Sequence, residues 1–187
     1  MRRYVLVLDF GAQYTQLIAR RVRELNVYCE IHPFNHLPEI TAGVKGIILS
    51  GGPASVRDKK SPAIDLSVYR KKLPVLGICY GAQLIAQQSG GKVLPSKMRE
   101  YGRASLDIYF RNDELFNNVN DHSQVWMSHS DTISSVPQNF IVTAGTGSIK
   151  IAAFHEPQEK IFGVHFSSYM TAVKKNEFDV LYISINK

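Results

Sequence analysis

The sequence has few cysteines and no long apolar run, and both absences limit the kind of protein it encodes. Two cysteines in 187 residues cannot form the disulfide framework of a small secreted domain. The apolar stretch near the start is interrupted at Asp9, which is too early for the core of a secretory signal. No segment approaches the roughly 20 apolar residues that span a bilayer. We therefore expect a cytoplasmic protein with no membrane partner.

A continuous basic stripe is also missing, although the formal net charge is +6. The Lys and Arg residues occur in short clusters that are spread along the chain. Nucleic-acid-binding proteins more often concentrate basic residues on one face, with aromatic residues among them. We therefore expect a solvated surface and no nucleic-acid partner, with protein docking as the alternative. The length, and a hydrophobic content of 44%, favour one domain over residues 1–187 with a substantial core.

Strand-like and helix-like segments alternate in the first half of the chain. We expect strands at 4–10, 27–31, 46–50 and 74–78, and helices at 13–25, 62–72 and 81–89. Apolar strands separated by helices are typical of a parallel sheet that is covered on both faces. The second half instead contains strand-like runs in quick succession, at 104–110, 124–129, 140–145, 150–154 and 160–166. The pattern predicts an α/β fold, with an antiparallel section added to a mostly parallel sheet.

Cys79 lies between two glycines, after an apolar strand and before a helix. Such a turn raises a nucleophile above the sheet, and the glycines allow the backbone and a substrate to approach closely. The helix N-terminus favours the thiolate, and the amide of Tyr80 can donate to an oxyanion. A small buried cysteine is the alternative interpretation, but the paired glycines favour a nucleophile. The glycines of residues 49–53 follow a neighbouring strand and can supply a second oxyanion donor.

Five segments carry a resemblance to a known family: VLDFGAQYTQLIARRVRE, ILSGGPASV, LGICYGAQLIA, REYGRA and QVWMSHSDT. From about residue 4 to residue 164, the chain resembles the glutaminase (class I glutamine amidotransferase) domain or subunit of GMP synthases. The resemblance implies a flavodoxin-like three-layer fold and the hydrolysis of glutamine to glutamate and ammonia. It also implies a GMP synthetase (ATP pyrophosphatase) partner that uses this ammonia to convert XMP to GMP. ATP and magnesium are expected only in that partner, with no cofactor and no metal in this domain.

The resemblance also assigns roles to individual residues. Cys79 matches the nucleophile, which attacks the amide carbon of glutamine, releases ammonia and leaves a thioester for water to hydrolyse. The backbone amides of Gly52 and Tyr80 match the oxyanion donors. The expected substrate contacts are Gln83, Ser128 and Asp131. The nearby His129 matches a structural histidine of the family and not its catalytic base.

The chain departs from the family where the base belongs. The family motif G-V-Q-F-H-P-E is replaced by GVHFSSYM at residues 163–170, so Ser167 and Tyr169 occupy the positions of the catalytic histidine and glutamate. Serine cannot accept the thiol proton near neutral pH, and tyrosine cannot orient an imidazolium as a carboxylate does. Two substitutes are considered: His165, and a His155–Glu156 pair expected in the turn before the motif strand.

Three functional interpretations therefore stay open. The chain is an active glutaminase, a catalytically impaired glutamine-binding or regulatory module, or another cysteine hydrolase outside glutamine chemistry. The atypical tail at 165–187 reflects a naturally inactive relative, a shifted reading frame or a rearranged site. The sequence has no glycine-rich nucleotide loop of an ATP pyrophosphatase, so we expect the synthetase to be a separate subunit or another part of a fused enzyme.

Overall fold

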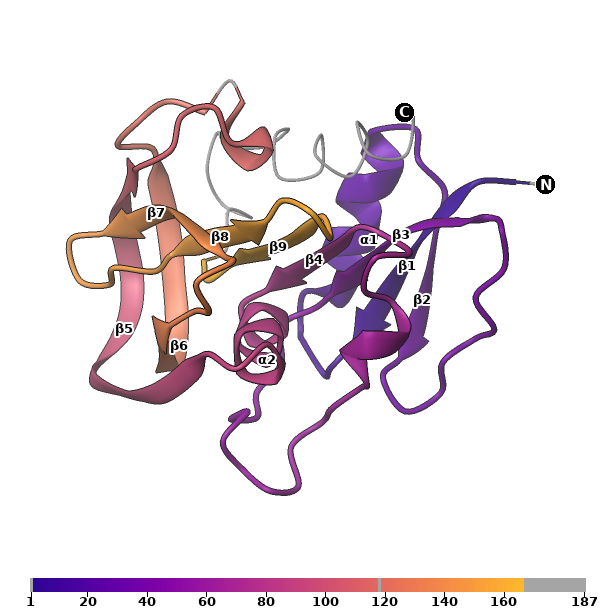
Figure 1. Ribbon diagram of the computed structural model, residues 1–187, viewed down its shortest axis with the longest axis horizontal. Helices are drawn as coiled ribbons and strands as arrows, with labels where there is room; N and C mark the ends of the chain where they lie inside the picture. Colours follow the sequence, from indigo (N-terminus) through magenta and orange to yellow (C-terminus); the bar gives the residue numbers. More distant parts are fainter. Residues whose placement is uncertain (1, 118, 167–187) are drawn as a thin grey trace.

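The computed structural model describes residues 2–117 and 119–166. Within these ranges the chain forms nine strands, two α-helices and two short 3-10 helices (Figure 1). In chain order they are β1 (Tyr4–Asp9), α1 (Thr15–Glu24), β2 (Cys29–Pro33), β3 (Val44–Leu49), η1 (Leu66–Val68), β4 (Val75–Ile78), α2 (Tyr80–Gln88), β5 (Lys92–Ile108), η2 (Glu114–Phe116), β6 (Gln124–Ser135), β7 (Ile141–Thr146), β8 (Ala153–Glu156) and β9 (Ile161–Val164).

The nine strands form one sheet in the order β2-β1-β3-β4-β9-β8-β7-β5-β6. The first five strands of this order pair in parallel. The remaining pairs, from β9 to β6, are antiparallel. The sheet therefore confirms the predicted α/β architecture, in which an antiparallel section extends a parallel one. The junction is β9, which pairs with β4 on one side and with β8 on the other.

The two helices cover opposite faces of the sheet, above and below it in Figure 1. Ile18 and Val22 of α1 belong to the hydrophobic core on one face. Leu84 and Ile85 of α2 belong to the core on the other face. Alternate residues of β1 enter the two cores, because successive side chains of a strand point to opposite faces. The sheet is the middle of the three expected layers.

Three sequence-based boundaries were wrong. The expected helix over 62–72 is reduced to η1, which Asp65 caps by accepting from the Ser67 amide and which is followed by Lys71 in the left-handed region at φ 62°. β5 begins at Lys92, well before the expected start at 104, because this segment pairs along β6. β8 lies at Ala153–Glu156 and not at 150–154.

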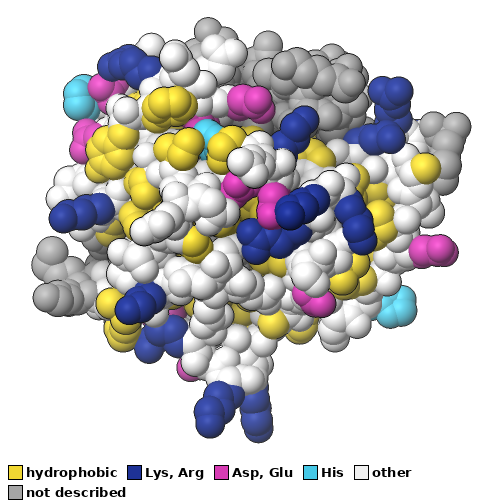
Figure 2. All heavy atoms as spheres, in the orientation of Figure 1, with side chains coloured by type: hydrophobic (Ala, Val, Ile, Leu, Met, Phe, Trp, Pro, Cys, Tyr) yellow, Lys and Arg dark blue, Asp and Glu magenta, His cyan; other side chains and the backbone are white. Residues whose placement is uncertain are grey.

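The surface agrees with the distribution of charge in the sequence. Figure 2 shows Lys and Arg side chains in small separate groups on the visible face, without a continuous stripe. Within the described part of the chain, no helix has the length and apolarity needed to cross a membrane.

Candidate active site

Cys79 occupies the tight turn between β4 and α2, at the carboxyl edge of the parallel strands. Its backbone has φ 49° and ψ −104°, a conformation that is uncommon for a residue with a side chain. The Cys79 amide donates to the carbonyl of Val164 at 2.8 Å, which joins the turn to the end of β9. Its own carbonyl accepts from the Gln83 amide at 3.0 Å, which begins the hydrogen-bond ladder of α2. The thiol is neither fully buried nor fully exposed.

The two flanking glycines are required by close packing of backbones. A Cβ atom on Gly77 would lie 2.5 Å from the carbonyl carbon of Gly81. A Cβ atom on Gly81 would lie 2.5 Å from the carbonyl oxygen of Leu49 at the end of β3. These distances are shorter than van der Waals contact, so any larger residue at either position would displace α2 from β3 and β4. The close approach of backbones predicted for both glycines is therefore confirmed.

The loop after β3 reaches the cysteine. A Cβ atom built on Gly51 would lie 3.7 Å from that of Cys79, and one on Gly52 would lie 2.6 Å from the carbonyl oxygen of Phe10. The hydroxyl of Ser50 accepts from the Phe10 amide at 2.9 Å and donates to the Gly51 carbonyl at 2.8 Å. The structure therefore brings the two sequence-predicted loops together, with Gly51 beside Cys79 and the next residue, Gly52, packed against the Phe10 backbone.

Tyr80 begins α2, so its amide has no hydrogen-bond acceptor within the helix. Its side chain is buried away from that amide, with the hydroxyl donating to the Pro62 carbonyl at 2.5 Å. Burial raises the pKa of this hydroxyl. The phenol therefore anchors the turn, and the backbone amide is the part of Tyr80 available to an oxyanion.

Gln83 connects three elements below the cysteine turn. Its side chain is buried, and its Nε2 amide donates to the Asp131 carbonyl at 3.2 Å. The same nitrogen lies 2.9 Å from Nε2 of His165. An amide nitrogen donates and does not accept, so His165 Nε2 is the acceptor in this contact. Ile78 and Val164 are register partners, so Cys79 and His165 follow paired residues at the ends of β4 and β9. The Nε2 nitrogen of His165 is nevertheless in contact with Gln83.

Asp131 is buried in β6, and its carboxylate is occupied by two residues of the loop after β3. Nε and Nη2 of Arg57 donate to Oδ1 at 3.1 Å and 2.9 Å, and the Ser55 hydroxyl donates to Oδ2. Ser128, the other expected substrate contact in this strand, is exposed. Sequence reasoning missed Arg57, since its partner lies 74 residues away and no local pattern marks the pair.

The structure excludes the His155–Glu156 pair that was considered as a substitute for the missing base. Both residues lie in β8 and not in a turn, and adjacent residues of a strand point to opposite faces. The buried carboxylate of Asp113 is the acid beside His155, bonded to its Nδ1. Glu156 instead accepts from the Glu159 amide at 2.5 Å. Neither the pairing nor the role of Asp113 was predicted, because Asp113 lies 42 residues earlier in the chain.

Ser167 and Tyr169, at the positions of the family's base and orienting carboxylate, lie outside the described residues. Among the residues that the structure describes, no group of three or more His, Cys, Asp or Glu side chains is arranged to hold a metal ion.

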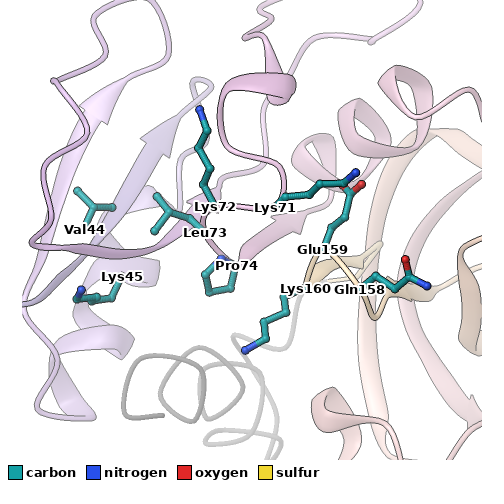
Figure 3. Close-up of a pocket in the computed structure, with 9 residues that line it drawn as sticks. All are labelled: Val44, Lys45, Lys71, Lys72, Leu73, Pro74, Gln158, Glu159 and Lys160. Atoms are coloured by element: carbon teal, nitrogen blue, oxygen red, sulfur yellow. The ribbon is translucent and has the colours of Figure 1, made fainter.

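A separate hollow of about 380 Å³ lies at the opposite ends of the parallel strands (Figure 3). Four lysines line it, together with the residues that lead into β3, β4 and β9: Val44, Lys45, Lys71, Lys72, Leu73, Pro74, Gln158, Glu159 and Lys160. Glu159 forms an ion pair with Arg70 at 2.5 Å. This hollow is distinct from the cysteine site, which lies at the carboxyl ends of the strands. Ligands of open α/β sheets bind outside those carboxyl ends.

The fold and the cysteine turn define the class of the protein. Residues 6–166 match the family model described as glutamine amidotransferase class-I, and the chain belongs to this family. Similarity to individual proteins is more specific than the match to the family model. The chain is 57% identical over 171 residues to the glutamine-hydrolyzing GMP synthase of Cytophaga hutchinsonii, and 52% identical over 166 residues to that of Phocaeicola vulgatus. These alignments cover 91% and 89% of this chain, but the chain spans only about a third of either relative (34% and 32%).

Solved structures show the same architecture. A Thermoplasma acidophilum protein, provisionally described as one subunit of a GMP synthase, superposes with a TM-score of 0.82 at 25% identity. That match covers 100% of this chain and 95% of the other. A glutamine amidotransferase of Thermotoga maritima shares the fold, with a TM-score of 0.73 at 19% identity over 100% of this chain and 85% of the other.

Proposed function

We propose that this chain is the glutaminase component of a GMP synthase, which hydrolyses glutamine to glutamate and ammonia. The observation that carries the proposal is the strained turn at Cys79, beside the glycine loop that follows β3. This arrangement suits acyl transfer, because the cysteine, the start of α2 and the glycine loop lie together at one edge of the sheet. The high identity to GMP synthases supports glutamine as the amide substrate.

The chemistry follows from this arrangement. The Cys79 thiolate adds to the amide carbon of glutamine, and the amides of Tyr80 and Gly52 donate to the oxygen that becomes negatively charged. The C–N bond then breaks, and the nitrogen leaves with an added proton as ammonia. Water hydrolyses the thioester to glutamate and restores the thiol. Neither step needs a metal or cofactor in this domain, and ATP and magnesium belong to the synthetase reaction.

Proton transfer is the step for which the chain is poorly equipped. Ser167 and Tyr169 replace the expected histidine and glutamate, so no imidazole stands at the position of the family's base. General-base assistance is typically worth about 10²–10⁴-fold in rate. We therefore expect slow turnover by the chain as it stands. A glutamine-binding or regulatory module would share the same pocket, although no comparison favours it.

The partner that we propose is a cytoplasmic GMP synthetase, which carries the ATP-dependent conversion of XMP. The relatives named GMP synthase are about three times as long as this chain, which is consistent with a synthetase part beyond the aligned region. Ammonia made at Cys79 would be passed to that part, either within one polypeptide or between two subunits.

A glutamine-like diazoketone tests the substrate assignment without requiring turnover. We expect it to alkylate Cys79, and we expect L-glutamine to slow that reaction while L-asparagine, one methylene shorter, does not. Peptide mapping by mass spectrometry locates the label, and a Cys79→Ala variant provides the control. Labelling of Cys79 that glutamine fails to slow would contradict the proposal and favour a cysteine hydrolase outside glutamine chemistry. Glutamine-dependent ammonia release, with and without a synthetase, measures the turnover itself.

A further inference from the structure

The hollow of Figure 3 has an apolar floor that belongs to the folded sheet. Two backbone hydrogen bonds join the starts of the three strands around it. The Ile47 amide of β3 donates to the Pro74 carbonyl at 3.0 Å, and the Val75 amide of β4 donates to the Lys160 carbonyl before β9 at 3.0 Å. The floor consists of one buried and two half-buried side chains: Val44, Leu73 and Pro74.

A basic rim surrounds this floor. Three of its lysines are exposed and the fourth, Lys45, is half-buried; the exposed ones are Lys71, Lys72 and Lys160. Among the described residues of the lining, Glu159 is the one acidic side chain, and it forms an ion pair with Arg70 at 2.5 Å. Because Arg70 neutralises this carboxylate, the hollow keeps the positive charge of its lysines.

Two of the rim lysines have an unfavourable backbone conformation. Lys71 has φ 62° and Lys160 has φ 53°, in the left-handed region that favours glycine or asparagine. Either of these residues would relieve the backbone but would remove a positive charge from the rim. Folding alone therefore does not account for lysine at both positions. Strained residues that persist in this way are often found where a protein binds a ligand.

The directions of the lysines favour an extended ligand over a compact one. In Figure 3 the side chains of Lys72 and Lys160 extend to opposite sides of Pro74, and Lys45 lies apart from both. A phosphate ion needs donors that converge on one point, whereas separated ammonium groups suit negative charges distributed along a chain. The described lining has no aromatic side chain on which nucleic-acid bases could stack. A flat membrane surface would not reach an apolar floor inside a hollow.

We propose that this hollow docks an acidic polypeptide segment of a partner protein. An apolar side chain of the segment lies on the floor, and flanking carboxylates pair with the lysines of the rim. The lysines at 71 and 72 thereby take the protein-docking role that the sequence left as an alternative. The hollow lies at the edge of the sheet opposite Cys79, so the inference goes beyond the proposed glutaminase function and does not depend on it.

A fluorescein-labelled peptide of sequence EDELEDE tests this docking in the full chain, with fluorescence anisotropy as the measurement. We expect saturable binding that weakens as salt is added, because exposed charges are screened. Replacing the central leucine of the peptide by serine should weaken binding by about tenfold, since an apolar side chain would no longer be buried on the floor. Equal binding of the two peptides, or no binding of either, would overturn the inference without any protein variant.

The protein variants locate the site. Lys71→Glu with Lys72→Glu should weaken binding of EDELEDE by about tenfold. The matched control is Lys59→Glu with Lys60→Glu, which reverses another adjacent pair of exposed lysines and changes the net charge equally. This control should bind as the parent does. Equal weakening in both variants would show general attraction to a basic protein and would overturn the inference.

Lys71→Gly with Lys160→Gly separates binding from folding. Glycine relieves both left-handed residues, so we expect a urea midpoint no lower than that of the parent but weaker binding of the peptide. A folded glycine variant that binds the peptide as tightly as the parent would contradict the assignment. Tighter binding of phosphatidylserine vesicles or of single-stranded oligothymidine than of the peptide, lost in Lys71→Glu with Lys72→Glu, would overturn the choice of a polypeptide.

Discussion

The ends of β4 and β9 lie side by side at the carboxyl edge of the sheet, but they differ in how much of a glutaminase site they carry. β4 (Val75–Ile78) continues into the turn of the proposed nucleophile, with Cys79 at φ 49° and backbones in contact on both sides. β9 (Ile161–Val164) keeps the family's pattern only as far as Phe166, which is buried in the core. The match to the family model also ends at residue 166.

This difference separates two ways of building a catalytic group. The turn at Cys79 depends on backbone: a positive φ angle, the Tyr80 amide at the start of α2 and glycines that permit close approach. Many residues hold it in place, so its sequence pattern is long and its geometry follows from packing. The base depends on one imidazole side chain at the end of a strand. A single change of residue type removes it while the fold around it persists.

The largest effect should come from restoring the second strand end. The three replacements Ser167→His, Ser168→Pro and Tyr169→Glu together restore the residues of the family motif that follow Phe166. We expect ammonia release from glutamine to rise by about 10²–10⁴-fold, because an imidazole can accept the thiol proton and a carboxylate can fix its tautomer. The Cys79 amide already bonds to the Val164 carbonyl at 2.8 Å, which holds the two strand ends together.

The control for this experiment adds Cys79→Ala to the triple variant, which should abolish the gain. Release is measured with and without a synthetase partner, because a partner can order a site but cannot supply the missing side chain. A folded triple variant that releases no more ammonia than the parent would contradict the lost-base explanation. The defect would then lie in the placement of the residues after Phe166 and not in their identity.

The next largest effect should come from disturbing the first strand end. Gly77→Ala would place a Cβ atom 2.5 Å from the carbonyl carbon of Gly81 and 2.6 Å from the Ala82 nitrogen. We expect it to lower the free energy of unfolding by about 3 kcal/mol, at the upper end of overpacking effects. Gly147→Ala, where a new Cβ atom meets nothing within 4 Å, should change it by less than about 0.5 kcal/mol. Urea unfolding of both variants measures the difference, and equal stabilities would contradict the packing account of the turn.

Local sequence signals were sufficient for the parts of the molecule that backbone geometry controls. The apolar runs predicted the strands of the parallel half, and the glycines around Cys79 predicted the turn. The alternation of strands and helices also indicated that these strands are parallel, because parallel neighbours need a crossover connection. These features are encoded within a few residues of where they occur.

The contacts between distant side chains could not be predicted in this way. Asp131 meets Arg57 over a separation of 74 residues, and His155 meets Asp113 over 42. The first pair forms where β6 packs against the loop after β3, and the second forms where the segment between β5 and η2 packs against β8. Adjacency in sequence suggested Glu156 for His155, but the alternation of side chains along β8 excludes that pair. Neither pair lies on one element, so no local pattern in the sequence marks it.

The smallest expected effect compares the two cysteines as thiols. Cys29 in β2 is 1% exposed, its Sγ lies 3.4 Å from the Ala19 carbonyl oxygen, and burial raises its pKa above the ordinary value of 9.0. Cys79 is more accessible and stands at the N-terminus of α2, which favours its thiolate. We therefore expect iodoacetamide to label Cys79 faster than Cys29 near neutral pH, because Cys79 is more accessible and the burial of Cys29 disfavours its thiolate.

The sign of the pH dependence follows from the raised pKa of Cys29. The folded state disfavours its thiolate, so the stabilisation from a protonated Cys29 is complete below the pKa of the unfolded chain. It is lost as the pH rises through the higher pKa of the folded state. Labelling of Cys29 should thus increase at alkaline pH as unfolding becomes easier, while a Cys29→Ala variant should leave the labelling rate of Cys79 unchanged. Peptide mapping that found Cys29 labelled first near neutral pH would remove the evidence for an activated Cys79, whatever residue stands at position 167.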